Sequence, residues 1–203
     1  MKLLVIGAGG HAKVVIDAAL GAGMRIAGVV ADSADPAELM GFPVSRSAEG
    51  LDADAFIIAI GDNDARARAF ESYVAKGLEP AIVVHPSAMI APSVTLGAGT
   101  FVAAGAVVNI DATVGRNVIL NTGCTVDHDC RIDDHAHIAP GVNLCGGCAV
   151  GQGALIGVGA SLIPLISVGE WSVVGAGAAV IDHMPPNSSC AGVPARVFRT
   201  DGV

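Results

Sequence analysis

Hydrophobic and polar positions follow two different periods along the chain, and the change comes between residues 80 and 90. In the first part, short apolar runs of strand type alternate with segments of helical period. In the second part the period is six residues, and it continues without a break to about residue 184. We therefore expect two domains of different architecture, residues 1–80 and residues 81–203.

The first domain has the alternation of strands and helices that is typical of a small parallel α/β unit. The expected elements are a strand over 3–7 (LLVIG), a glycine-rich turn and helix within AGGHAKVVIDAALGAG, a strand over 25–32, a third strand ending at Gly61, and a helix capped by Asp62 or Asn63. Three strands of this kind predict a short, Rossmann-like parallel sheet.

The second domain repeats one pattern sixteen times. Every sixth residue from Ile90 to Val180 is aliphatic, and the position four residues later, from Val94 to Met184, is nearly always small or apolar. Chance does not produce sixteen unbroken hexads, so we expect short strands joined by tight turns in a parallel β-helix. The pattern resembles that of the hexapeptide-repeat proteins, in which three hexads form one triangular coil that winds left-handed. Sixteen hexads then make a little over five coils, with no inserted loop.

Composition and charge narrow the possible partners. The formal net charge is −8, and the sequence has neither a basic cluster nor an aromatic ladder, so we expect no nucleic acid and no membrane surface as a partner. No apolar run approaches the length of a membrane span, and glycines interrupt the apolar start of the chain. Five cysteines without paired or CxxC spacing are typical of a reducing compartment, so we expect a cytoplasmic protein.

The polar block over 121–138, NTGCTVDHDCRIDDHAHI, is the main candidate for chemistry. Its cysteines and Cys148 fall on the small inward position of the repeat, so we interpret them as packing residues, while Cys145 and Cys190 fall elsewhere without zinc-like spacing. The gamma-class carbonic anhydrases, another prism-shaped family, have two metal-binding histidines five residues apart. Here the histidine spacings are seven and two, so we expect no metal.

Acid/base chemistry is the interpretation that remains. The repeat places His128 outward, and His137 lies half a coil further along. A carboxylate beside an imidazole, as in His128-Asp129, fixes the tautomer and stabilises the imidazolium, which suits a general base near neutral pH. The alternative is that these outward histidines are solvated or contact another subunit.

A second candidate site is the turn from Gly7 to Ala12 (GAGGHA), between a strand and a helix. Glycines let the backbone approach a phosphate, and a helix N-terminus supplies N–H groups and a favourable dipole. Asp32, at the end of the second strand, stands where such folds place a ribose-binding acid. Three strands are too few for a redox dinucleotide domain, so a mononucleotide fits better, although any tight turn would favour glycines.

From end to end the chain resembles the sugar acyltransferases that carry a short α/β domain before a left-handed β-helix. This family includes the bacillosamine-pathway and perosamine N-acetyltransferases and the sialic acid O-acetyltransferases. The motifs that carry the resemblance are GAGGHAKVVIDA near the start, IAIGDN at 58–63, VVHPSAMIAPS at 83–93, ILNTGCTVDHDCRIDDHAHIAPGV, and the closing GVPAR.

The resemblance implies a role for each matching residue. His128 corresponds to the catalytic base, Asp129 to the acid that orients it, and Asn121 to a residue near the acceptor amine. For acetyl-CoA it implies four residues. His137 corresponds to a second active-site histidine, Gly146 to a glycine whose N–H faces the thioester carbonyl, and Val158 and Ala176 to positions along the pantetheine arm. For the nucleotide sugar it implies Gly9, Gly10, His11, Asp32 and Gly61. Two features depart from some relatives: Ala31 precedes Asp32 where they have a second acid, and Asp129 replaces a glutamate.

The sequence therefore predicts an enzyme that transfers an acetyl group from acetyl-CoA directly to the amine of a nucleotide-linked amino sugar. Because the prism has no loop to hold a substrate, we expect the first domain to hold the nucleotide and a homotrimer to complete the CoA cleft. The alternatives are O-acetylation of sialic acid or a related free sugar, and a non-catalytic trimeric scaffold. Neither the nucleotide base nor the sugar follows from the sequence.

Overall fold

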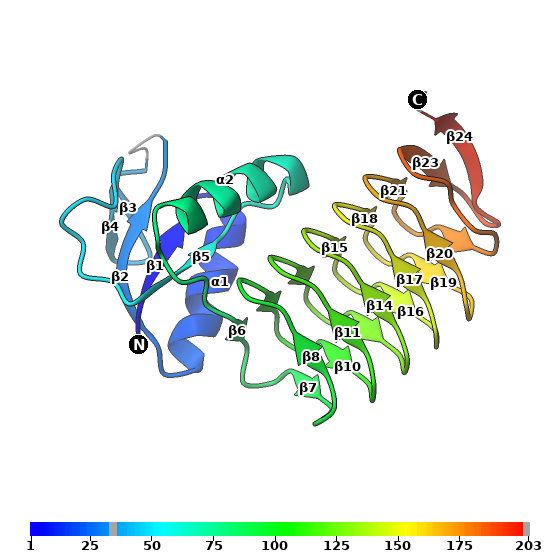
Figure 1. Cartoon of the computed structure of the whole chain (residues 1–203), viewed down its shortest axis with the longest axis horizontal. Coiled ribbons are helices and arrows are strands. Elements are labelled where there is room, and N and C mark those ends of the chain that lie inside the picture. The colour runs from blue at the N-terminus through cyan, green and yellow to red at the C-terminus, as the bar shows by residue number, and fades with distance from the viewer. Residues whose placement is uncertain (33–35, 201–203) are drawn as a thin grey trace.

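The computed structural model describes residues 1–32 and 36–200, and within them a small α/β domain packs against one end of a long triangular β-helix (Figure 1). The strands of the α/β sheet follow the order β3-β4-β2-β1-β5. Their bounds are β1 Lys2–Ile6, β2 Arg25–Val30, β3 Glu38–Leu39, β4 Phe42–Ser45 and β5 Ala55–Ile58, and the two helices are α1 Gly10–Gly21 and α2 Asn63–Ala75. The parallel sheet with helices between its strands is confirmed.

Two details of this domain differ from the sequence-based expectation. The sheet has five strands rather than three, because the polar segment after β2 contains β3 and β4, an antiparallel pair turning at Met40 and Gly41. Such short strands carry too few residues to show a period of two. The third expected strand ends at Ile58 rather than at Gly61, so Ile60 and Gly61 belong to the turn that leads into α2.

The second domain is a prism of two-residue strands whose three faces are three parallel sheets. Residues 18 apart pair between successive coils, as Val107 pairs with Thr125, so three hexads make one coil as expected. One face contains β7 Met89–Ile90, β10 Val107–Val108, β13 Thr125–Val126, β16 Asn143–Leu144, β19 Ser161–Leu162 and β22 Ala179–Val180. The next contains β8 Thr95–Leu96, β11 Thr113–Val114, β14 Arg131–Ile132, β17 Ala149–Val150 and β20 Ser167–Val168.

The third face contains β6 Val83–Val84, β9 Phe101–Val102, β12 Ile119–Leu120, β15 His137–Ile138, β18 Leu155–Ile156, β21 Val173–Val174, β23 Ser188–Ala191 and β24 Arg196–Thr200. The last strand is antiparallel to β23 and ends the described chain. No loop interrupts the frame between β7 and β22, as the sequence predicts.

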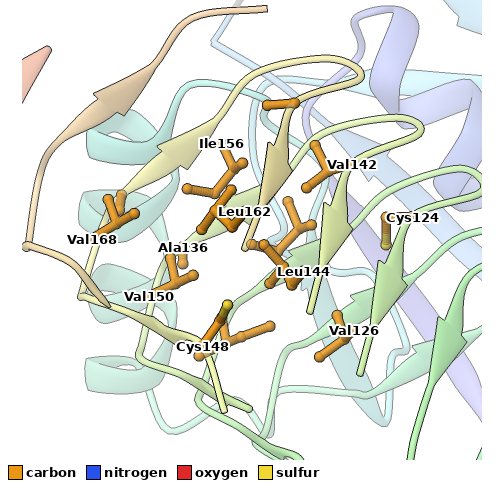
Figure 2. Close-up of a cluster of buried hydrophobic side chains, with 14 of the residues drawn as sticks. Cys124, Val126, Ala136, Val142, Leu144, Cys148, Val150, Ile156, Leu162 and Val168 are labelled. Atoms are coloured by element: carbon orange, nitrogen blue, oxygen red, sulfur yellow. The ribbon is translucent and has the colours of Figure 1, made fainter. Parts of the chain in front are cut away.

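The interior of the prism is a single column of apolar side chains (Figure 2). The aliphatic position of each hexad is buried from Val102 to Val180, whereas Ile90 and Leu96 at the open end are only partly buried. Cys124, Cys130 and Cys148 are buried in the same column, so their interpretation as packing residues is confirmed. Cys190, which the repeat did not place inside, is also buried there, because the chain continues to wind after β22 and β23 pairs in parallel with β21.

The α/β domain contacts the third face of the prism and the turns beside it. α1 lies against β6, and the Asn63 side chain at the start of α2 donates hydrogen bonds to the carbonyls of Gly153 and Ala154 at 2.9 and 3.2 Å. Among the described residues, neither helix is long and apolar enough to cross a membrane.

The inside-outside alternation of a prism strand can be tested with one matched pair in β21. Val174 is 1% exposed in the column, whereas its neighbour Val173 is 41% exposed. We expect Val174→Ala to lower the free energy of unfolding by about 2 kcal/mol, because it removes buried methyl groups and leaves a cavity. Val173→Ala should change it by less than about 0.5 kcal/mol. Urea unfolding at one protein concentration measures both, and equal losses would contradict the assigned frame.

Candidate active site

His128 and Asp129 lie in a turn between two faces of the prism. This turn belongs to a stack formed by residues 109–112, 127–130, 145–148 and 163–166, which we name the His128 edge. The His128 Nδ1 atom lies 2.7 Å from Asp129 Oδ2, and the side chains are 56% and 67% exposed. The His128 backbone N–H donates to Asp127 Oδ1 at 2.8 Å. The imidazole is thus held by its neighbours, with Nε2 free to meet a substrate.

The charges around His128 favour its protonated form. The hydrogen bond that His128 donates to Asp129 and the charge of Asp127 raise the pKa of His128 above its usual 6.5. A neutral His128 whose Nδ1–H is held by Asp129 presents Nε2 as a base, and the nearby carboxylates stabilise the imidazolium that forms when a proton is taken up. The geometry is therefore that of an oriented general base.

The His128 ring rests on the next coil of the same edge, at Gly146. A Cβ atom on Gly146 would lie 2.6 Å from both Cε1 and Nε2 of the ring, so only glycine permits this approach. Within the described part of the chain, the Gly146 N–H has no hydrogen-bond acceptor. A free backbone donor consequently lies beside the imidazole, as an oxyanion site requires.

Asn121 and His137 meet at a different edge. This second stack of turns, residues 103–106, 121–124, 139–142, 157–160 and 175–178, is named the Asn121 edge. The Asn121 Nδ2 atom lies 3.0 Å from His137 Nε2, and its Oδ1 accepts a hydrogen bond from the Thr122 N–H at 2.8 Å. Because the amide donates to Nε2, His137 is neutral and its proton is on Nδ1.

The α/β domain covers His137, although the repeat points it outward. The His11 ring, at the start of α1, lies 6.5 Å from the His137 ring and 5.5 Å edge-on from the Phe101 ring. Burial first, and then the positive charge of Arg66, lower the pKa of His137 to about 3 and that of His11 to about 4. Both histidines are therefore neutral rather than acids. His137 keeps the outward direction that the repeat predicts, but α1 leaves it only partly exposed in the single chain.

Arg66 joins the two domains at this place, although no motif in the sequence marks it. Its side chain is 1% exposed and reaches from the first turn of α2 into a third stack of turns, residues 115–118 and 133–136. The guanidinium donates to five backbone carbonyls, those of Ile60, Gly61, Asn117, His135 and Ala136, at 2.6 to 3.3 Å. No carboxylate in the described residues forms an ion pair with it, and burial lowers its pKa to about 10.

A pocket of about 540 Å³ lies at the carboxyl ends of the α/β sheet strands. Its lining includes Ile6, Gly7, Val30, Asp32, Arg46, Ile60, Arg68, Tyr73 and Lys76. Ligands of open α/β folds bind at such ends of strands, and the three cations beside one carboxylate suit a phosphorylated ligand with a hydroxyl-bearing sugar. Arg46, Arg68, Tyr73 and Lys76 were not identified from the sequence, because no motif marks them.

The start of α1 is open. Gly9 is the N-cap in an extended conformation without a side-chain cap, and no acidic residue lies in the first turn. A Cβ atom on Gly9, Gly10 or Gly61 would meet no other atom within 4 Å. Helix N-termini of this kind attract anions. Gly7 lines the pocket, while Gly9 and Gly10 lie beyond its wall and His11 turns away toward the prism.

The candidate residues thus fall into three groups. His128, Asp129 and Gly146 share the His128 edge, whereas Asn121, Val158 and Ala176 lie on the Asn121 edge beside His137; Gly7 and Asp32 surround the pocket. The two edges bound the same face of the prism, and no contact joins the first two groups within the described residues. Among those residues, no group of three histidines, cysteines or acids could hold a metal ion.

The chain is similar to known proteins over its N-terminal domain and over its full length. The PglD N-terminal domain family matches residues 2–73. The structure of PerB from Caulobacter crescentus, in complex with CoA and GDP-perosamine, is 39% identical, covers 98% of each chain and has a TM-score of 0.92. The acetyltransferase domain of PglB from Neisseria gonorrhoeae, in complex with acetyl coenzyme A, is 36% identical over 97% of this chain and 98% of that one, with a TM-score of 0.89. No curated protein sequence matches the chain.

The role of Arg66 in holding the domains together can be tested by comparing its replacement with that of the nearby, exposed Arg68. We expect Arg66→Met to lower the free energy of unfolding by at least about 3 kcal/mol, because three buried and two partly buried hydrogen bonds are lost. Arg68→Met is the matched control, since its side chain is 68% exposed and pairs with Asp64; it should lose less than about 1 kcal/mol. Urea denaturation of the three proteins measures the difference, and similar losses would refute the structural role.

The burial of His137 predicts a pH dependence of stability. Its pKa is lowered to about 3 in the folded chain, so the unfolded chain takes up a proton first as the pH falls below 6.5. This contribution is complete above pH 6.5, and about 2 kcal/mol of it is lost by pH 5. Replacing His137 with Gln removes the titration. Unfolding at pH 8 and pH 5 should therefore show a smaller loss for the variant, and equal losses would show that His137 titrates normally.

Proposed function

The chain belongs to the hexapeptide-repeat sugar acyltransferases, the family of perosamine N-acetyltransferase and of the PglB acetyltransferase domain, and from this premise we propose its reaction and the residues that perform it. The enzyme transfers an acetyl group from acetyl-CoA to the amino group of a nucleotide-linked amino sugar. The observation that carries this proposal is the His128-Asp129 pair resting on Gly146, whose N–H is free.

His128 acts as the general base. The amine nitrogen attacks the thioester carbonyl carbon, a C–N bond forms, and the amine proton passes to Nε2 of His128. The C–S bond then breaks, and the departing thiolate of CoA takes this proton from the imidazolium. Asp129 holds the ring through Nδ1 and stabilises its positive charge. A positioned base of this kind contributes about 10²–10⁴-fold to the rate.

The Gly146 N–H stabilises the negative charge that develops on the carbonyl oxygen. A well-aimed donor of this kind is worth roughly 3–4 kcal/mol in the transition state. Asn121 holds the acceptor amine, and its own amide is fixed by the neutral His137 and by Thr122. We propose direct transfer without an acyl-enzyme, and the two cysteines that the repeat places inward at this edge, Cys130 and Cys148, are buried in the column.

The nucleotide part of the acceptor occupies the pocket of the α/β domain. Asp32 meets ribose hydroxyls, while Arg46, Arg68 and Lys76 provide positive charge for the phosphates. The open start of α1, with Gly9, Gly10 and the nearby Gly61, is a second place for phosphate oxygens. The solved relative PerB was crystallised with GDP-perosamine, a ligand of this class.

A homotrimer completes the site. His128 and Asn121 lie in the turns at opposite edges of one prism face, and the segment 124–127 with β13 keeps these turns about 13 Å apart. One small acceptor amine cannot touch both, but the His128 edge of one copy can face the Asn121 edge of the next. The same cleft between copies brings Val158 and Ala176 to the pantetheine arm. We place the enzyme in the cytoplasm, where its five free thiols are stable.

The proposal is tested by CoA release from acetyl-CoA with a panel of UDP-, GDP- and dTDP-linked amino sugars and free sialic acid. Turnover with a nucleotide amino sugar, abolished in His128→Ala, is the expected result. Turnover with free sialic acid alone would assign the chain to O-acetylation. If a protein that sediments as a trimer releases no CoA with any acceptor, the result would favour a non-catalytic scaffold.

The role of Asp129 is tested by the pH profile. His128 must be neutral to accept a proton, so kcat/KM should rise with pH through a pKa above 6.5. In Asp129→Asn that pKa falls, so the acid limb moves to lower pH while the plateau drops by about tenfold or more. Asp111→Asn is the matched control, because Asp111 has the same place in the preceding coil, with φ 61° against 57°. An unmoved limb in Asp129→Asn would contradict the assignment.

A further inference from the structure

Leu165 occupies an unusual position two coils along the His128 edge. Leu165 is 72% exposed. Its backbone φ is 65°, a left-handed conformation that Gly, Asn and Asp adopt far more readily than Leu. The equivalent positions of the three preceding coils are filled by Asp111, Asp129 and Gly147. Leu165 therefore places a large apolar side chain in water where the turn itself favours a small or polar residue.

The side chain of Leu165 does not extend freely into solvent. A Cβ atom on Gly147 would lie 2.6 Å from Leu165 Cδ2, so the isobutyl group folds back over Gly147. From the other side, the His128 ring lies over Gly146. Two backbone hydrogen bonds hold the coils together here, from Gly147 N–H to the His128 carbonyl at 2.9 Å and from Leu165 N–H to the Gly146 carbonyl at 3.0 Å.

The two side chains flank the glycine pair, and we name the glycine pair the floor and the place between the side chains the notch. One wall is the imidazole of His128, and the other is the apolar side chain of Leu165. Neighbouring coils are spaced by about 4.8 Å, so the walls belong to backbones about 10 Å apart. The free N–H of Gly146 lies at this floor. The notch is polar toward His128 and apolar toward Leu165.

An acyl thioester likewise has a polar part and an apolar part. Its carbonyl oxygen needs a donor and its carbonyl carbon must lie near the base, whereas the chain beyond that carbon is apolar. We propose that Leu165 is the specificity-determining residue for the acyl donor: it closes the apolar end of the notch, so that the acetyl methyl group fits and longer acyl chains do not. This inference rests on the proposed acetyl transfer with His128 as the base.

Apolar contact also explains why Leu stands in a strained position. The side chain is exposed in the single chain, together with Ile163 and Pro164 beside it. An acetyl group packed between Leu165 and the glycine floor would remove apolar surface from water on both partners. Because the acyl group is small, one well-placed side chain is enough to discriminate it from the next homologue.

The test compares acetyl-CoA, propionyl-CoA and butyryl-CoA as donors for the nucleotide amino sugar that the wild-type enzyme accepts. One methylene in an apolar pocket changes kcat/KM by about 10–200-fold, so the wild type should prefer acetyl over propionyl by at least about tenfold. Leu165→Gly keeps the backbone conformation and opens the notch. The propionyl-to-acetyl ratio should then rise by about fivefold or more, and Leu165→Met should restore the wild-type ratio.

Met40→Gly is the matched control, because Met40 is also exposed, at 45%, and has a φ of 52° in the distant β3–β4 turn. It should leave the donor ratio unchanged. An active Leu165→Gly enzyme with the wild-type ratio would overturn the role of Leu165 and leave the proposed function intact. Sedimentation measures whether Leu165→Gly remains assembled. If this variant dissociates and loses activity equally with all donors, Leu165 is an assembly contact and the proposal fails. A wild-type protein that acylates no amino sugar would overturn the proposed function as well.

Discussion

The arrangement of the two domains depends on one buried cation, Arg66, that forms no ion pair with a carboxylate of the described residues. Arg66 satisfies its donors with carbonyls of the β5–α2 turn and of two successive prism coils. Carbonyls in these positions are fixed by the backbone, so the guanidinium acts as a rigid joint rather than as one member of a flexible ion pair. Burial between the two domains, and after it the charge of Arg66, keeps the adjacent His11 and His137 neutral. The contact between the domains thus sets both the geometry and the protonation at their boundary.

That joint connects the pocket of the α/β domain with the residues proposed for acyl transfer. Ile60 lines the pocket, and its carbonyl accepts a hydrogen bond from Arg66; the same guanidinium holds His135, in the coil that also carries His137. The position of the pocket relative to Asn121 is therefore set by backbone on both sides of the boundary. Flexible loops, which many enzymes use for this purpose, are not required.

The prism was largely predictable from the sequence, because a strict period of six leaves one way to place each side chain. Val126 and Cys124 are inside and His128 is outside, as the frame requires. Contacts between domains were not predictable in the same way. His137 points outward by the frame but is covered by α1, and Arg66 is indistinguishable by type from the exposed Arg68. Only its spacing of four residues from the buried Phe70 carries a signal.

The 18-residue coil also limits how a protein of this kind can change in length. Removing or adding one residue between β7 and β22 would exchange inner and outer positions in every later hexad, whereas a whole coil could be added without disturbing the column. Such a change would move each later turn along the prism axis by about 4.8 Å, the spacing of adjacent strands. The distance between a nucleotide pocket and a catalytic edge is therefore adjustable in discrete steps, and homologues of this architecture are expected to differ in reach by whole coils.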